Sequence, residues 1–322
     1  MVLAVLALAG CSALSESGAK LEVAQLQLDP TLLVATTRKP VSGARARPWY
    51  GPERAGRVSV ARARLTPPDQ GRFSRASIGL SDWRLETVDM LPKVGDLLAE
   101  AHFTRDVLVY VHGFNQTFEA AVLDAARLSD GVRFHGETMV FSWPSKAKLF
   151  EYGYDRESAM WSRDALELVL AEILANPASA RIHIVAHSIG TMLTMEALRQ
   201  LYARQGSAAV ERIGAVVFAA PDIDMDVFGS SVQRIGPLAS RITVVAATND
   251  RALALSGLLS GGITRVGAVE QAKLERLGLR VIDASGRGLG IINHDLFLSD
   301  ARIREVIRRA IDGRAQTSTL HP

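Results

Sequence analysis

The sequence predicts a three-layer α/β fold with a mainly parallel sheet, preceded by a β-rich N-terminal extension. After residue 105, short apolar runs rich in β-branched residues alternate with longer segments in which apolar residues recur at helical spacing. Such alternation is typical of strand–helix units that build a parallel sheet between two layers of helices. Before residue 100, residues 57–65 alternate between apolar and polar instead, which indicates a strand with one solvent-exposed face.

The extension is predicted to cover residues 30–100. A strand is expected at 32–37, and a second at 57–65, where polar and apolar residues alternate as in a strand with one solvent-exposed face. The segment 38–57 is rich in Arg, Pro and Gly and therefore predicts a loop. After residue 65 an irregular segment with one more short strand is expected, followed by a short helix at 92–100.

The core is predicted to cover residues 105–313 and to form, with the extension, one domain from residue 30 to residue 313. Continuous apolar runs predict strands buried on both faces, at 107–111, 138–142, 182–185, 215–220, 242–247 and 279–283. Helical periodicity predicts helices at 118–128, 155–174, 192–201 and 301–311. Asn176-Pro177 ends the long second helix. The tail 314–322 is expected to fray.

The N-terminus has the pattern of a targeting segment. Residues 1–10 form an apolar run too short to span a bilayer, and small residues precede Cys11. This segment resembles a bacterial lipobox, although it lacks a Lys or Arg before the apolar run. Cys11 is the only cysteine, so it cannot form a disulfide within the chain. The sequence therefore predicts a signal peptide with a lipidated Cys11, a tether at 12–29, and an anchor in the cell envelope facing the periplasm. By the same resemblance to lipoproteins, Ser12 in place of Asp directly after Cys11 favours sorting to the outer membrane.

Composition excludes several classes of function. The net charge is +3, but the basic residues are scattered and aromatic residues make up only 6%, so no nucleic-acid-binding stripe is present. His183 and His187 are four apart, yet the first is expected on a strand and the second in a turn, which is no metal-binding pattern. Glycines are dispersed and form no phosphate loop. We expect neither a metal nor a cofactor, and the oligomeric state stays open.

One segment carries the pattern of a catalytic nucleophile. Ala186-His187-Ser188-Ile189-Gly190 lies between a predicted strand and a predicted helix, as does the nucleophile elbow of α/β-hydrolases. A serine on so tight a turn takes a strained backbone conformation, which requires small residues two positions away on either side. Ala186 and Gly190 meet this requirement, although glycine is more usual at the first position. Ser188 is therefore the predicted nucleophile.

Two backbone N–H groups are predicted to form an oxyanion hole. Ligands bind at the carboxyl ends of strands in open α/β sheets, and the first core strand ends in His112-Gly113-Phe114. A His-Gly pair here resembles the oxyanion loop of many esterases and lipases, with the N–H of Phe114 facing the carbonyl oxygen. The N–H of Ile189, at the start of the elbow helix, would be the second donor. A tight turn at Gly113, supported by His112, is the simpler explanation and is compatible with this role.

Candidates for the triad acid follow two later strands. Asp250 comes directly after the predicted strand 242–247, where it could orient an imidazole and stabilise its charged form. The alternatives are Asp222 and Asp224, which follow the strand 215–220. Turn or N-cap duty is also common for aspartate. Asp250 is the predicted acid, with the other two kept open.

The general base is predicted in the Gly-rich loop after the last strand. His294 lies at the end of that loop, and only a late loop of this kind can bring a histidine over the elbow from beyond the sheet edge. The chain order Ser188, Asp250, His294 is the order of the triad in α/β-hydrolases. Agreement in order and in position after strands is stronger evidence than the elbow pentapeptide alone.

The chain also resembles a known family over a little more than half its length. The resembling segments are Val111-His-Gly-Phe-Asn-Gln-Thr-Phe-Glu-Ala-Ala121, Phe141-Ser-Trp-Pro-Ser145, Tyr154-Asp155, Ser158-Ala159, Ala186-His-Ser-Ile-Gly190, Ala220-Pro-Asp-Ile-Asp224 and Asp250-Arg-Ala-Leu253. They are similar to the bacterial α/β-hydrolases of unknown function called DUF900, whose elbow typically has Met where this chain has Ile189. The resemblance implies an esterase- or lipase-like serine hydrolase and gives no substrate.

The sequence thus predicts a serine hydrolase that acts on a carboxylic ester or a related acyl bond through an acyl-enzyme. The expected partner is a small acyl ester of unknown chain length. Two alternatives remain: a non-catalytic envelope lipoprotein with a hydrolase fold, because fold does not guarantee function, and an acyltransferase or thioesterase that uses the same triad.

Overall fold

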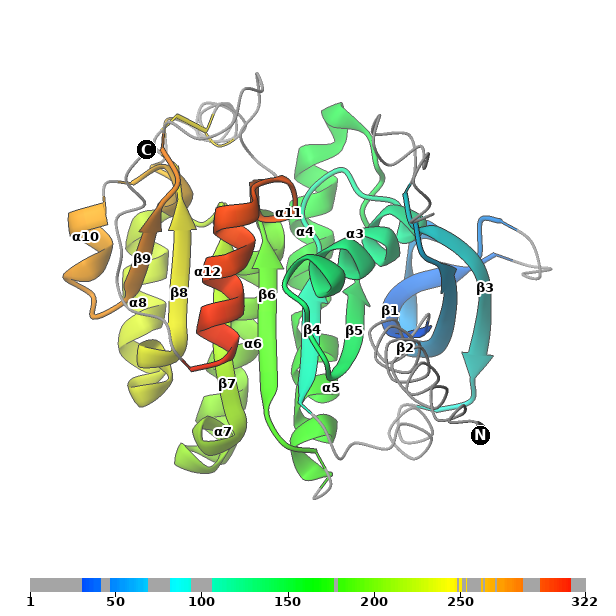
Figure 1. Cartoon of the computed structure of the whole chain (residues 1–322), viewed down its shortest axis with the longest axis horizontal. Coiled ribbons are helices and arrows are strands. Elements are labelled where there is room, and N and C mark those ends of the chain that lie inside the picture. Colours follow the sequence, from blue (N-terminus) through cyan, green and yellow to red (C-terminus); the bar gives the residue numbers. More distant parts are fainter. Residues whose placement is uncertain are drawn as a thin grey trace, which may run out of the picture.

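The computed structural model describes residues 31–41, 47–68, 82–93, 106–176, 179–247, 249–250, 253, 262, 264–269, 271–285 and 296–313. In this part of the chain, a nine-stranded sheet lies between two layers of helices, with the strand order β3-β2-β1-β5-β4-β6-β7-β8-β9 (Figure 1). All pairs from β1–β5 to β8–β9 are parallel, whereas β1–β2 and β2–β3 are antiparallel. The predicted three-layer α/β fold with a mainly parallel sheet is confirmed.

The strands of the sheet are β1 (Thr31–Pro40), β2 (Tyr50–Thr66), β3 (Arg84–Leu91), β4 (Val107–Val111), β5 (Glu137–Ser142), β6 (Ile182–His187), β7 (Ile213–Ala219), β8 (Ile242–Ala246) and β9 (Arg280–Asp283). The α-helices are α3 (Phe118–Gly131), α4 (Tyr152–Trp161), α5 (Arg163–Ala175), α6 (Ile189–Gln205), α7 (Ser207–Arg212), α8 (Met225–Arg234), α10 (Gln271–Glu275), α11 (Leu296–Ser299) and α12 (Ala301–Ile311). Short 3-10 helices are η2 (Leu149–Glu151), η3 (Gly236–Arg241) and η4 (Val266–Ala268).

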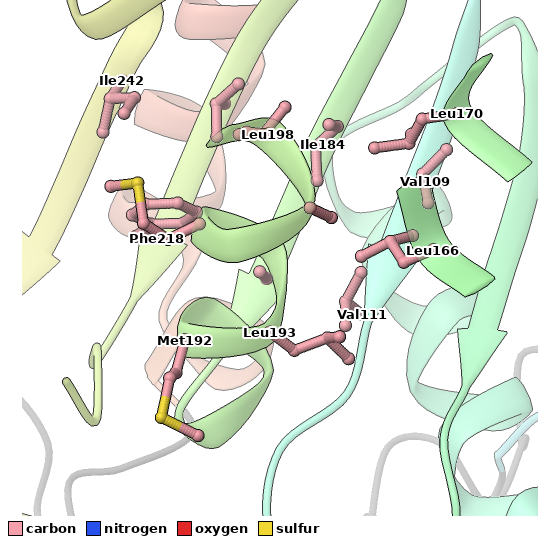
Figure 2. Close-up of a cluster of buried hydrophobic side chains, with 14 of the residues drawn as sticks. Val109, Val111, Leu166, Leu170, Ile184, Met192, Leu193, Leu198, Phe218 and Ile242 are labelled. Atoms are coloured by element: carbon pink, nitrogen blue, oxygen red, sulfur yellow. The ribbon is translucent and has the colours of Figure 1, made fainter. Parts of the chain in front are cut away.

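The central strands form because both of their faces are covered. All residues of β4, β6, β7 and β8 are buried. On one face, α5, α6 and α8 enclose a large apolar cluster, and on the other α3, α11 and α12 enclose a second one (Figure 1). Figure 2 shows part of the first cluster, to which α6 contributes Leu193 and Leu198 and β4 contributes Val109 and Val111. Full burial of one such side chain contributes about 2 kcal/mol, so these layers fix the position of α6 and of the turn before it.

The extension differs from its prediction in one respect, because the segment 38–57 is mostly strand. β1 continues to Pro40 and β2 begins at Tyr50, with Arg38 paired to Arg54 across irregular registers. Pro52 is tolerated because β3 pairs only with residues 60–66 of β2, which leaves the edge at Pro52 without a strand partner among the described residues. On its other side, β1 pairs in parallel with β5. The extension therefore continues the central sheet.

The long helix predicted at 155–174 is wrong, because two helices occupy this region. α4 ends at Trp161 and α5 begins at Arg163, with Ser162 between them at φ −86° and ψ 0°. The Ser162 hydroxyl donates to the Ser158 carbonyl at 2.8 Å and lies 2.9 Å from the hydroxyl of Thr37 on β1. A serine side chain competes with the helix for backbone carbonyls, and here a strand that lies 125 residues earlier in the chain takes part.

Several predictions lie outside the described residues: the signal peptide with Cys11, the tether 12–29, the helix at 92–100 beyond residue 93, the loop that carries His294, and the tail 314–322. These stay predictions. Among the helices that the structure describes, none is both long and apolar enough to cross a lipid bilayer.

Candidate active site

Ser188 lies on a strained turn between β6 and α6. Its backbone has φ 52° and ψ −125°, in a region that a residue with a side chain rarely adopts. Such a conformation costs of order 1–3 kcal/mol and persists only where its surroundings hold it. Here the Ser188 N–H donates to Ala219 O at 3.0 Å, and Ser188 O accepts from the N–H of Thr191 at 3.0 Å and of Asp222 at 3.3 Å. The predicted elbow geometry is therefore present at the predicted serine.

Two glycines allow the loop after β4 to lie directly against this turn. A Cβ at Gly190 would be 2.3 Å from His112 O and 2.8 Å from Val111 O, and both are backbone atoms. A Cβ at Gly113 would be 2.9 Å from the Cβ of Ser188. These separations are shorter than van der Waals contact, so any larger residue would push the loop and the turn apart. The loop of residues 112–116 can therefore lie against Ser188 because Gly113 and Gly190 have no side chains.

The two predicted oxyanion donors belong to the two segments that meet here: the N–H of Ile189 to the elbow turn, and the N–H of Phe114 to the 112–116 loop. Ile189 is the first residue of α6, so its N–H has no acceptor within the helix. On the other side, the backbone hydrogen bonds of the described residues include none from the N–H of Phe114. The next residue, Asn115, has a positive φ of 60°, which turns the loop sharply after Phe114. The half-buried Phe114 ring meets Tyr152 edge-on, with centroids 5.5 Å apart.

His112 supports the loop from inside the core. It is fully buried and stacks on Trp143 with ring centroids 4.6 Å apart. The Trp143 indole N–H donates to His112 O at 2.8 Å, while the His112 Nε2 lies 3.1 Å from Trp143 O and Nδ1 lies 2.8 Å from Gly113 O. Burial, with the Arg38 charge nearby, lowers the pKa of His112 to about 3, although the two carbonyl oxygens favour the protonated ring. The neutral imidazole has one N–H, so it donates to only one of these two carbonyls. His112 is therefore a neutral clamp on the loop at physiological pH.

This shift has a consequence for stability. Between its folded pKa of about 3 and the usual His value of about 6.5, His112 binds a proton only in the unfolded chain. The free energy of unfolding should therefore fall as the pH falls through this window. We expect His112→Gln to remove this contribution, so that urea titrations between pH 4 and 6 give the parent a slope steeper by up to about 1.4 kcal/mol per pH unit.

The difference between parent and variant isolates His112, because other groups that titrate in this window occur in both proteins. Among them is His183, whose pKa burial also lowers. Equal slopes in the parent and in His112→Gln would contradict a buried neutral imidazole.

The three candidate acids have different surroundings. Asp250 is buried just beyond the end of β8, where its Oδ1 accepts from Leu253 N–H at 3.1 Å. Asp222 is buried beside the elbow, with Oδ1 3.0 Å from Arg265 Nε and Oδ2 accepting from the Tyr152 hydroxyl at 3.0 Å.

Asp224 accepts from the N–H groups of Asp226 and Val227 and so caps the N-terminus of α8. Asp222 therefore belongs to a buried ion pair, and Asp224 caps a helix. Asp250 directly follows the end of β8, which is the strand predicted at 242–247. The predicted base, His294, lies outside the described residues. Among those described, no three His, Cys, Asp or Glu side chains form a potential metal site.

Sequence analysis did not predict a second buried group, formed by Arg38 on β1 and Asp155 on α4. Both are fully buried, and both hydrogen-bond to the 112–116 loop. Arg38 lies at the start of the segment whose composition predicts a loop, and it is 78 residues from its partner Gln116 in the chain. No local pattern could have paired them.

A family model described as "Alpha/beta hydrolase of unknown function (DUF900)" matches residues 95–310. The match covers the core strands, the elbow and the segment that contains Asp250. This chain belongs to the DUF900 family. Arg38 and the strands β1 to β3 lie before the residues that the DUF900 model matches.

Individual relatives are distant. The "Uncharacterized protein alr1448" of Nostoc sp. is 25% identical over 122 residues, which cover 30% of this chain and about a third (32%) of that protein. Among solved structures, Arabidopsis thaliana SOBER1 is 13% identical with a TM-score of 0.40, covering 65% of this chain and 99% of its own. A putative α/β-hydrolase of Agrobacterium tumefaciens, ATU1826, is 14% identical with a TM-score of 0.40, covering 79% and 93%. None of these values supports the transfer of a substrate.

Proposed function

We propose that this protein is a serine hydrolase of carboxylic esters or related acyl bonds, with Ser188 as nucleophile, His294 as general base and Asp250 as the acid that orients it. The substrate would be a small acyl ester, met at the cell envelope, to which a lipid on Cys11 would attach the chain. The proposal rests above all on Ser188. A strained serine between a buried strand and a helix N-terminus, with a second backbone segment packed against it, is the arrangement of the nucleophile and oxyanion loop in α/β-hydrolases.

In the proposed reaction, Ser188 Oγ attacks the acyl carbon while His294 takes the hydroxyl proton. The carbonyl electrons move to its oxygen, which the N–H groups of Phe114 and Ile189 stabilise. The intermediate collapses, the ester C–O bond breaks, and His294 gives the proton to the departing alcohol. Water then attacks the acyl-enzyme with the same help, which releases the carboxylic acid and restores Ser188. Asp250 would stabilise the imidazolium in both halves.

The proposal is tested with a fluorophosphonate probe on the full-length protein. We expect the parent to be labelled, Ser188→Ala to remain unlabelled, and His294→Ala to react at least about 100-fold more slowly, because a general base contributes roughly 10²–10⁴-fold. Ser240→Ala is a suitable control, because Ser240 is exposed and lies in η3, and it should be labelled like the parent. Absence of labelling in the folded parent would contradict the proposal.

Turnover then separates the proposed activity from its alternatives. p-Nitrophenyl esters of increasing acyl length should be hydrolysed by the parent and not by Ser188→Ala, and the length that gives the highest kcat/KM defines the acyl specificity. Product transfer to an added alcohol in preference to water would indicate an acyltransferase instead. Labelling without turnover of any ester would leave a thioester or another acyl bond as the substrate class to screen next.

A further inference from the structure

Arg38 connects the extension to three segments of the core. Its side chain is 1% exposed although it carries a guanidinium group. Nε donates to Ser142 Oγ at 2.9 Å, at the end of β5, and Nη1 donates to Ser145 O at 2.9 Å, in the loop that follows. Nη2 donates to Gln116 O at 2.7 Å. The planar guanidinium thus fixes the distance between the 112–116 loop and the loop after β5.

Asp155 completes this connection from the helix layer. It lies on α4 and is fully buried. One carboxylate oxygen accepts from the Asn115 N–H at 3.2 Å and from the Ser145 hydroxyl at 2.5 Å, and the other accepts from the Lys146 N–H at 2.8 Å. Ser145 Oγ accepts in turn from the Gln116 N–H at 3.1 Å. Three backbone groups of the 112–116 loop are therefore held by Arg38, Asp155 and Ser145.

These contacts act on the part of the loop that follows the predicted oxyanion donor. Asn115, directly after Phe114, has a positive φ of 60°, and such a conformation is unfavourable for a residue with a side chain. The Asn115 N–H and both backbone groups of Gln116 have partners that oppose relaxation. An oxyanion donor is effective only if it is already in place when charge develops on the substrate.

A structural role alone is a poor explanation for this group. Burial of a charge costs several kcal/mol, and apolar residues of similar volume often stabilise a core as well or better. Burial lowers the pKa of Arg38 to about 9, so the side chain stays charged at neutral pH. The nearby Asp155 charge and four hydrogen bonds offset part of this cost. A buried charge with such directional bonds specifies geometry more than it adds stability.

We propose that Arg38 is a positioning residue which, with Asp155 and Ser145, holds the 112–116 loop so that the Phe114 N–H can stabilise the oxyanion, an inference that rests on the proposed hydrolase function. It follows that β1 of the extension supports the catalytic site through Arg38, although β1 lies outside the residues that the family model matches. The core would therefore need the extension for full activity.

The test compares Arg38→Met with Arg54→Met in the full-length protein. Arg54 also lies in the extension. It donates to Ser158 Oγ at 2.9 Å and lies over the rings of Tyr154 and Trp161, and among the described residues it forms no hydrogen bond or ion pair with the 112–116 loop. For p-nitrophenyl butyrate we expect Arg38→Met to lower kcat by about 10²–10³-fold, the usual effect of losing one oxyanion donor, with KM changed less than about threefold. Arg54→Met should keep the kcat of the parent. Arg38→Lys keeps the positive charge but loses the planar guanidinium with its several N–H donors. Its kcat should lie between those of Arg38→Met and Arg54→Met.

A second readout follows the loop itself. Backbone hydrogen exchange in peptides that cover residues 112–116 should be faster in Arg38→Met and unchanged in Arg54→Met. Ser145→Ala removes the acceptor of the Gln116 N–H with little loss of volume, and it should give the same two changes in a milder form. It therefore tests the inference even if Arg38→Met does not fold.

Each remaining outcome overturns the inference in a recognisable way. If the parent and Arg38→Met hydrolyse esters at a similar rate, Arg38 does not position the 112–116 loop. The same conclusion follows if Arg38→Met loses kcat but hydrogen exchange in the loop is not faster. If Arg38→Met and Ser145→Ala both fail to fold while Arg54→Met folds, the group serves the fold alone. If the parent itself shows neither labelling nor turnover, the proposed function is wrong, and the inference about Arg38, which depends on it, is wrong as well.

Discussion

Ser188→Gly is expected to be inactive and yet more stable than the parent. Loss of Oγ removes the nucleophile, so kcat/KM for a p-nitrophenyl ester should fall on the order of 10⁶-fold. Glycine adopts φ 52° and ψ −125° without the steric cost that serine has there, which releases about 1–3 kcal/mol. The greater freedom of glycine in the unfolded chain takes back about 0.5–1 kcal/mol. The free energy of unfolding should therefore rise by about 1 kcal/mol.

Ser188→Ala separates the two effects, because it removes Oγ and keeps the side chain that causes the strain. It should be equally inactive, with a stability close to that of the parent. Urea denaturation of the three proteins measures the difference, and Ser240→Gly provides a matched control at a serine without positive φ, where glycine should be slightly destabilising. A Ser188→Gly protein less stable than Ser188→Ala would mean that the turn stores no strain.

The core of the fold was predictable because several local signals agreed. Strands such as β4 and β6 are short, β-branched and buried on both faces, so the sequence pattern and the tertiary environment favour the same structure. The elbow was predictable for the same reason: a buried strand, a small-x-Ser-x-small turn and helical periodicity follow one another without a gap. Gly190 satisfies a steric demand that the sequence pattern encodes directly.

The errors arose where a distant segment decided the local structure. Residues 50–57 have the composition of a loop, but pairing with β1 makes them a strand. The helix break at Ser162 depends partly on Thr37, and the position of Arg38 depends on acceptors up to 107 residues away. None of these contacts leaves a local pattern. Likewise, the sequence predicted Asp250 as the acid but could not exclude Asp222, because each follows a strand and only the fold places Arg265 beside Asp222.

Asp250→Asn and Asp222→Asn are expected to fail in different ways. Loss of the triad acid leaves the imidazole in the wrong tautomer and lowers kcat by about 10⁴-fold, with the fold intact. We expect this result for Asp250→Asn. Asp222→Asn instead removes the charge opposite the fully buried Arg265, a change that typically costs about 3–5 kcal/mol of stability. Its kcat per folded molecule, counted by fluorophosphonate titration, should stay within about tenfold of the parent.

The double variant Asp222→Asn with Arg265→Met sharpens the distinction. If Asp222 and Arg265 form a structural pair, removal of both charges should recover part of the stability lost in Asp222→Asn, measured by urea denaturation as a coupling energy of about 0.5–3 kcal/mol.

A triad acid would behave otherwise, because no change at Arg265 restores a lost carboxylate to the histidine. An Asp222→Asn protein that is stable but has lost kcat about 10⁴-fold, beside a fully active Asp250→Asn, would transfer the role of the acid to Asp222. We expect the first result, that of a structural pair, because Arg265 and the Tyr152 hydroxyl each already contact one Asp222 carboxylate oxygen. A carboxylate bound in this way is a weaker partner for an imidazolium.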